Sequence, residues 1–176
     1  MKIFETDRLI LRPYSLDDAE AAFEVYRDPE VCEFIRPDGP ETSVENQRAT
    51  IQKIMDRYNE MGNGFNCWAI VEKETGGLSG SAMLKPLPGH QEIEVGWHLG
   101  RWVWGRGYAG EAGRRLLKYG FEELGLVRIV AVVDPRNTRS LSVARRLGMT
   151  EESMVRAYDH DLVLFAMTAD EWNGNE

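Results

Sequence analysis

Alternating apolar and polar positions predict strands at seven places along the chain. The clearest alternation covers 91–99, where Glu92, Glu94 and His98 fall on one side and the apolar residues between them on the other. Two carboxylates are therefore expected on one face of this strand. The other strand patterns cover 9–14, 65–71, 78–86, 128–134, 152–158 and 162–168.

Apolar residues at helical spacing predict four helices between these strands. The first begins at Ser15 and runs to about Arg27, and the second begins at Thr42 or Ser43 and ends near Met61. The third follows the segment 104–110 and ends at Gly125, and the fourth runs from Asn137 or Thr138 to Gly148. Turns at 73–77 and 159–161 predict two hairpins.

Three glycines are crowded into the turn before the third helix, in the sequence Trp104-Gly105-Arg106-Gly107-Tyr108-Ala109-Gly110-Glu111-Ala112. Glycine tolerates positive φ and has no Cβ, so successive N–H groups can converge on an anion. The helix N-terminus that follows adds a partial positive charge. The segment predicts a phosphate-binding turn.

The same glycines also match the G-x-G-x-x-G of a dinucleotide-binding turn, and the next strand ends at Asp134 as such a fold requires. A dinucleotide fold needs further strand–helix–strand units, yet only about 40 residues follow Asp134, and they predict one short helix and a hairpin. Five residues also separate the strand from the first glycine. A dinucleotide enzyme is therefore the weaker alternative.

With 176 residues, of which 43% are hydrophobic, the chain can bury one core and needs no second. A single domain over 1–176, with its core at 5–168, is expected. The net charge of −8 argues against nucleic acid or an acidic membrane as partner. Without a membrane-length apolar run or a signal peptide, a cytoplasmic protein is expected. Cysteines and histidines lack metal-ligand spacing, so no metal site is predicted.

The basic residues are concentrated around the glycine turn. Residues 101–146 hold ten Lys or Arg against four acidic residues, whereas the rest of the chain holds 11 against 25. For any single arginine, a solvated helix face is the plainer explanation. For the whole segment, the pattern favours a polyanionic ligand beside the turn and a cationic substrate approaching from the acidic remainder.

Four motifs, taken in order, carry a resemblance to a known family. They are Thr6-Asp7-Arg8-Leu9-Ile10-Leu11-Arg12, Glu94-Val95-Gly96-Trp97, the glycine turn, and Asn137-Thr138-Arg139-Ser140 leading into Arg146-Leu147-Gly148-Met149. The chain resembles the GNAT superfamily of acyl-CoA-dependent N-acetyltransferases, in particular the branch of the ribosomal-protein acetyltransferases RimJ and RimL. Trp104 stands where the superfamily's pyrophosphate loop usually has Gln or Arg, and the RimJ/RimL-like branch commonly has Trp there.

The resemblance implies an α/β GNAT fold, with a mixed, largely antiparallel sheet that splays between the fourth and fifth predicted strands and about four flanking helices. Acetyl-CoA is the implied acetyl donor and CoA the product. Its pantetheine is expected in the splay, beside a backbone N–H that stabilises the oxyanion. The implied cofactor-binding residues are Trp97, His98, Leu99, Trp104, Gly105, Arg106, Gly107, Tyr108, Ala109, Gly110, Asn137 and Ser140.

Acetyl transfer to an amine needs a group that removes a proton, because alkyl amines are mostly protonated at neutral pH. Glu94 is the candidate base, directly or through water. Glu92 either shares this work, raises the pKa of Glu94, or is a solvent-facing carboxylate. By resemblance, Ser140 is the proton donor for the leaving thiolate, and Tyr158 is the alternative.

The acceptor is expected to be a primary amine, either a protein N-terminus or a small molecule, and the acidic remainder of the chain favours a cationic one. A non-catalytic acyl-CoA-binding sensor on the same fold remains an alternative. A homodimer is a further implication of the resemblance.

Overall fold

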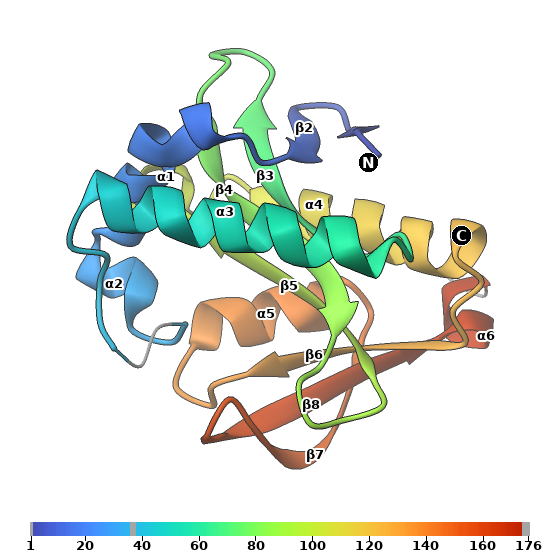
Figure 1. The fold of residues 1–176 in the computed structure, drawn as a ribbon. Coiled ribbons are helices and arrows are strands. Elements are labelled where there is room, and N and C mark those ends of the chain that lie inside the picture. The colour runs from blue at the N-terminus through green and yellow to red at the C-terminus, as the bar shows by residue number, and fades with distance from the viewer. Residues whose placement is uncertain (1, 36–37, 174–176) are drawn as a thin grey trace.

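The computed structural model describes residues 2–35 and 38–173 and joins eight strands into one sheet (Figure 1). The strand order is β1-β2-β3-β4-β5-β6-β8-β7, and all neighbours are antiparallel except β5 and β6. The strands are β1 (Phe4–Glu5), β2 (Leu9–Pro13), β3 (Asn66–Glu72), β4 (Leu78–Pro86), β5 (Ile93–Leu99), β6 (Arg128–Val133), β7 (Thr150–Ala157) and β8 (His160–Thr168).

The parallel strands β5 and β6 pair at a single register position, Glu94 with Val130. The sheet therefore opens between them, as the resemblance implied. They are the fourth and fifth of the predicted strands, because β1 has only two residues and no alternation from which to predict it. The splay places the C-terminal end of β5 at a gap in the sheet.

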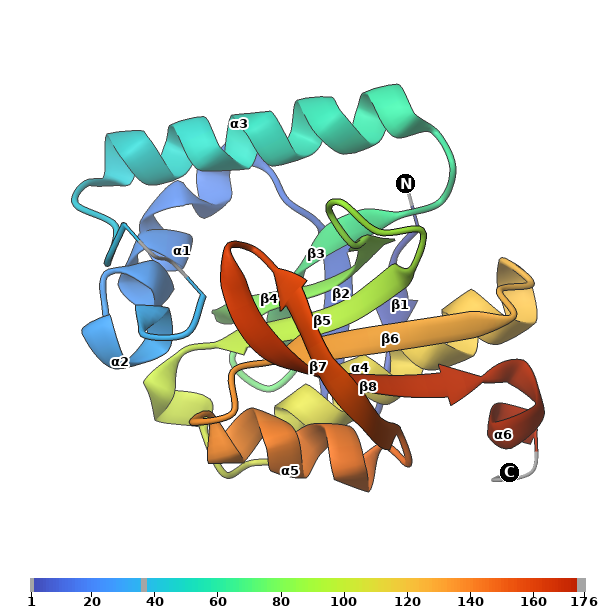
Figure 2. The same ribbon diagram turned by 90° about the horizontal axis from the view of Figure 1, so that it is seen from below.

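Helices cover both faces of the sheet (Figures 1 and 2). On one face lie α1 (Ala19–Tyr26) and α3 (Val44–Met61), and on the other lie α4 (Tyr108–Lys118) and α5 (Thr138–Arg146). These are the four predicted helices, with α1 preceded by a short 3-10 turn, Leu16–Asp18. Two short helices, α2 (Pro29–Cys32) and α6 (Ala169–Asn173), were not predicted, because neither is long enough to show a period.

Local chemistry explains most of the helix ends. The Ser43 side chain accepts a hydrogen bond from the N–H of Asn46 at the start of α3, and Gly62 ends that helix with a φ of 59°. After Lys118, the chain continues from α4 into a π-helical turn, Tyr119–Glu123, before the predicted stop at Gly125. In the described residues, no helix combines the length and apolar character needed to span a membrane.

The turn of the last hairpin was predicted one residue too late. His160 already pairs with Ala157, so the turn residues are Tyr158 and Asp159, with φ of 52° and 61°. A two-residue hairpin with both φ values positive twists in the same sense as its strands, and this geometry outweighs the preference of glycine for such positions. From this turn, the Tyr158 side chain reaches β5, where its hydroxyl donates to Glu94.

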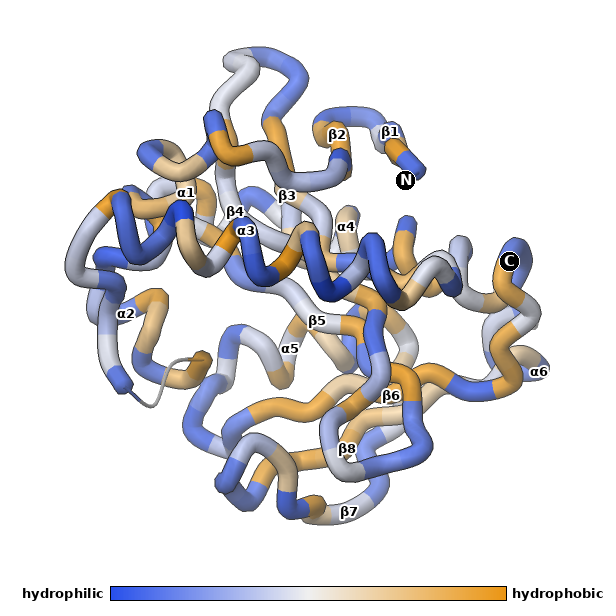
Figure 3. The backbone as a smooth tube through the Cα atoms, in the orientation of Figure 1, coloured by the Kyte–Doolittle hydropathy of each residue, from blue (hydrophilic) through white to orange (hydrophobic). Residues whose placement is uncertain are grey.

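The core has one apolar cluster on each face of the sheet and a third under the final hairpin. Strands β6 and β8 are hydrophobic over much of their length, whereas α3 alternates between polar and apolar residues (Figure 3). Helix α3 therefore buries a single stripe, which includes Ile51 and Tyr58.

Candidate active site

A cleft of about 850 Å³ lies where the end of β5, the glycine turn and the start of α5 meet. Val31 of α2 and the following Phe34 and Ile35 form another part of its wall. The predicted cofactor-binding residues line this cleft, with the exception of Arg106: Trp97, His98, Leu99, Trp104, Gly105, Gly107, Tyr108, Ala109, Gly110, Asn137 and Ser140.

The glycine turn has the backbone conformation that its sequence predicts. Gly105 and Gly107 have φ of 78° and 83°, in the left-handed region that favours glycine. A Cβ at Gly105 or Gly110 would meet no atom within 4 Å, so the backbone on this side is open. Helix α4 begins directly after Gly107. The turn and the helix N-terminus together fit the diphosphate of a nucleotide-bearing ligand.

Two arginines of α5, Arg139 and Arg146, line the same cleft. The Arg139 guanidinium lies 4.0 Å from the centre of the Trp104 ring, which holds it beside the glycine turn. Most other arginines of the basic segment are paired with acids, such as Arg136 with Asp134 at 2.8 Å. The positive charge available to a ligand is therefore concentrated on the α5 side of the cleft.

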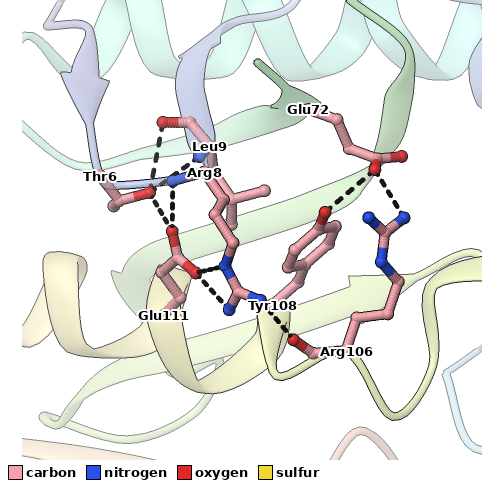
Figure 4. Close-up of polar contacts among 7 residues, drawn as sticks. All are labelled: Thr6, Arg8, Leu9, Glu72, Arg106, Tyr108 and Glu111. Carbon is pink, nitrogen blue, oxygen red and sulfur yellow. Dashed lines mark hydrogen bonds and ion pairs between the residues drawn. The ribbon is translucent and has the colours of Figure 1, made fainter. Parts of the chain in front are cut away.

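The glycine turn is braced from behind by the N-terminal segment (Figure 4). The Glu111 carboxylate accepts three hydrogen bonds, from Arg8 Nε at 2.7 Å, from the Arg8 backbone N–H at 2.9 Å and from Thr6 Oγ1 at 2.5 Å. Arg8 also donates to the carbonyl oxygen of Arg106 at 2.8 Å. Burial opposes ionisation of Glu111, but the hydrogen bonds from Thr6 and Arg8 lower its pKa. The motif of residues 6–12 and the motif of the glycine turn thus meet at Glu111.

Arg106 was predicted to bind the cofactor, but it does not line the cleft, and its side chain extends to Glu72 (Figure 4). Its guanidinium donates to Glu72 at 2.8 Å, and Tyr108 Oη donates to the same carboxylate oxygen at 3.0 Å. Glu72 is buried, so its charge requires such partners. The Tyr108 ring is held between the guanidinium groups of Arg8 and Arg106, each 4.8 Å from its centre.

Glu94 is buried on the sheet face that carries α1 and α3. Its Oε2 accepts a hydrogen bond from Lys85 at 2.9 Å and another from the hydroxyl of Tyr158. Burial, and then the negative charge of Glu94, raise the pKa of Tyr158, so the phenol remains a donor. Glu92 lies outside the strand and pairs with Arg128, which also binds Glu152.

Ser140 lies at the start of α5, in the wall of the cleft. Its backbone N–H donates to Asn137 Oδ1 at 3.1 Å, which caps the helix. Within the described chain, no hydrogen bond is found for the Ser140 hydroxyl. Tyr158, the alternative proton donor, binds Glu94 and does not line the cleft.

A second cavity, of about 260 Å³, lies between the sheet and α3. It shares two residues with the cleft, Ile35 and His98, so the two spaces meet beside the end of β5. Its wall consists of Tyr14, Tyr26, Ile35, Gln47, Thr50, Ile54, Arg57, Tyr58, Cys67, Met83, Lys85 and His98. Sequence patterns gave no indication of this cavity, because its residues come from seven separate segments of the chain.

Buried hydroxyl groups connect the wall of this cavity to His98. Ser81 Oγ lies 2.7 Å from Tyr14 Oη and 2.5 Å from Tyr26 Oη, and Tyr26 Oη lies 3.4 Å from His98 Nδ1. Burial raises the pKa of both phenols, so they remain protonated. The chain of hydroxyls fixes the His98 ring where the cavity and the cleft join.

The model of the Acetyltransferase (GNAT) domain matches residues 8–150, most of the chain. The protein belongs to the GNAT acetyltransferase family. A relative from Bacillus licheniformis, the uncharacterized N-acetyltransferase p20, is 36% identical over 99% of this chain and 100% of its own. The crystal structure of a GNAT-family acetyltransferase from Bacillus anthracis superposes with a TM-score of 0.82 and 27% identity, over 96% of this chain and 99% of that one.

A further solved structure concerns the RimJ/RimL-like branch of the family. The structure of a putative ribosomal-protein-serine acetyltransferase from Vibrio cholerae has a TM-score of 0.77 and 22% identity, over 95% of this chain and 97% of that one. RimJ/RimL-type proteins are thus among the structural neighbours, and at this identity the likeness concerns the fold. GNAT enzymes generally take their acetyl group from acetyl-CoA.

Sequence reasoning missed the partners of Glu94 in this GNAT enzyme. Lys85 lies opposite Glu94 in the antiparallel pairing of β4 and β5, and Tyr158 arrives from the final hairpin. Only the register of the sheet brings these three side chains together. Among the residues that the structure describes, no group of three His, Cys, Asp or Glu side chains could hold a metal ion.

Proposed function

We propose that this GNAT protein transfers an acetyl group from acetyl-CoA to a primary amine by direct attack in a ternary complex. The observation that carries the proposal is the meeting of two spaces at His98 and Ile35. One space has an anion-binding turn for the CoA diphosphate, and the other is a smaller cavity on the opposite side of β5. The amine and the thioester then approach each other from different sides of the strand.

The nitrogen lone pair attacks the carbonyl carbon of the thioester, a C–N bond forms, and the C–S bond breaks. The negative charge that develops on the carbonyl oxygen is stabilised by a backbone N–H of β5 around 97–99, which faces the splay. Ser140 gives its hydroxyl proton to the departing thiolate and recovers one from solvent. This role is supported by the position of Ser140 in the cleft wall.

Glu94 accepts the proton that the amine loses. Its Oε2 is already engaged by Lys85 and Tyr158, and the carboxylate lines neither space. Transfer through a water molecule in the smaller cavity is therefore proposed, since Lys85 borders that cavity. The two donors keep the carboxylate in one orientation for this transfer.

Two measurements test the proposal. Calorimetric titration should show that acetyl-CoA binds, and release of the CoA thiol should follow addition of an amine from a panel of peptides and small molecules. Tight CoA binding without turnover on any amine would favour a sensor, and stabilisation by NAD but not CoA would favour the dinucleotide alternative.

Glu94→Gln should lower kcat by about 10²–10³-fold, because general base catalysis contributes roughly that much. The KM for acetyl-CoA should change little. Glu92→Gln is the matched control, because Glu92 is a neighbouring carboxylate paired with Arg128. Equal loss in both variants would show that Glu94 has no specific role.

A further inference from the structure

The smaller cavity has a composition that restricts what can bind in it. Its volume of about 260 Å³ lies just under the range of about 300–1,000 Å³ found for drug-sized ligands, so it fits a small metabolite better than a folded peptide segment. Ile54, Met83 and the three tyrosines give it an apolar wall. The hydroxyls of Tyr14 and Tyr26 are already bonded to Ser81.

The charged residues of the cavity wall are basic. Arg57 and Lys85 line it, and no carboxylate does so among the described residues. Lys85 is neutralised by Glu94 at 2.9 Å. Arg57, an exposed residue of α3, is hydrogen-bonded to Tyr58 and forms no ion pair with a carboxylate in the part of the chain that the structure describes. An anionic group on the ligand would form a charge-assisted hydrogen bond with its guanidinium.

Gln47 supplies an independent observation on the same wall. Its side chain is buried, with 2% of the residue exposed, and its Oε1 has no hydrogen-bond partner among the described residues. A buried acceptor without a donor is unfavourable and rare. Gln47 lines the cavity, so its unsatisfied acceptor belongs to the wall that a bound ligand would contact.

Resting on the proposed function, we infer that the acceptor is a small primary amine with an apolar body and a terminal carboxylate or similar anion. The amine lies at the sheet wall, between His98 and the water that reaches Glu94. The apolar body packs between the tyrosines, and the anion binds Arg57 on α3. Gln47 accepts a hydrogen bond from the ligand. This class differs from the cationic acceptor that the charge distribution of the sequence favoured.

Three amines of equal chain length test the inference: ε-aminocaproate, which ends in a carboxylate, hexylamine, which ends in a methyl group, and hexamethylenediamine, which ends in an ammonium. The wild type should show the highest kcat/KM for ε-aminocaproate and the lowest for the diamine. Arg57→Gln should reduce the preference for ε-aminocaproate over hexylamine about tenfold, the size expected for a charge-assisted hydrogen bond. Lys53→Gln, on the same exposed side of α3 but outside the cavity wall, should leave it unchanged.

Binding of ε-aminocaproate in the presence of CoA should be measured by calorimetry alongside turnover. It should weaken in Arg57→Gln and in Gln47→Leu, and a melting curve shows that both variants fold. Turnover that favours the diamine, or a preference unaltered by Arg57→Gln, would overturn the inference while leaving acetyl transfer intact. Absent turnover with intact, Arg57-dependent binding would instead count against the proposed function alone.

Discussion

Ser140 is held by its backbone rather than by its hydroxyl. The bond from its N–H to Asn137 fixes the first turn of α5, and the residue lines the cleft. Read without context, Asn137 and Ser140 are ordinary residues of a helix start. Only their position in the wall of the cleft distinguishes them from any other helix cap.

Ser140→Ala should lower kcat by about 10²-fold, since it removes a positioned proton donor. The KM for acetyl-CoA and the melting temperature should barely change, because the cap uses the backbone N–H. Ser142→Ala offers the control: the same substitution, in the same helix and in the same cleft wall. Steady-state kinetics on both variants test whether Ser140 is the proton donor. A kcat equal to that of the wild type in Ser140→Ala would contradict this role and favour Tyr158.

Helix α4 begins at the glycine turn, and its first residues line the cleft. A left-handed glycine precedes its first residue, and another, Gly125 with φ of 65°, follows the π-helical turn at its far end. Both glycines serve the backbone in the same way, yet only Gly107 lines the cleft. A substitution at Gly125 therefore tests backbone strain alone, whereas a substitution at Gly107 tests strain and ligand binding together.

Gly107→Ala should destabilise the protein by about 1–2 kcal/mol, the penalty for a Cβ in the left-handed region. It should also raise the KM for acetyl-CoA several-fold, because the N–H groups of the turn shift. Gly125→Ala should cost similar stability, since a Cβ there meets nothing within 4 Å, but leave KM unchanged. Urea titrations and kinetics on the pair test this, and an unchanged KM in Gly107→Ala would contradict the assignment of the turn.

At the level of the whole molecule, residues more than a hundred positions apart hold the site together. Thr6 and Arg8, which lie between β1 and β2, bind Glu111 in the first turn of α4. The carboxylate also lies at the helix N-terminus, where its charge is favourable. One ionised side chain thus connects the N-terminal segment to the start of α4, which lines the cleft.

Glu111→Gln should lower the free energy of unfolding by about 1–2 kcal/mol at neutral pH, because the three charge-assisted hydrogen bonds to its carboxylate are weakened. The folded state lowers the pKa of Glu111 below its ordinary value of 4.5. Its contribution is therefore complete above that value and is lost as pH falls through the lowered pKa. Wild type and variant should converge in acid, whereas Glu74→Gln, in the exposed β3–β4 turn, should follow the wild type throughout. A constant gap would exclude the linkage.

The sequence determined the local elements of this protein. Period-two and helical patterns located seven of the eight strands and the four long helices, and the glycines at 105 and 107 made positive φ accessible in the turn before α4. These features depend on neighbours a few residues apart, so the chain contains the information directly. The motifs around Arg8, Glu94, Gly107 and Ser140 also sufficed to indicate the family.

Tertiary structure decided which side chains share a site. The register of β4 against β5 places Lys85 beside Glu94, and the two-residue turn of the last hairpin adds Tyr158. The buried carboxylate of Glu72 on β3 binds the Arg106 side chain, and Arg106 does not line the cleft. The cavity of Gln47 and Arg57 exists only once α3 lies over the sheet. Such contacts join distant segments, and their energies depend on burial and register, which no local pattern encodes.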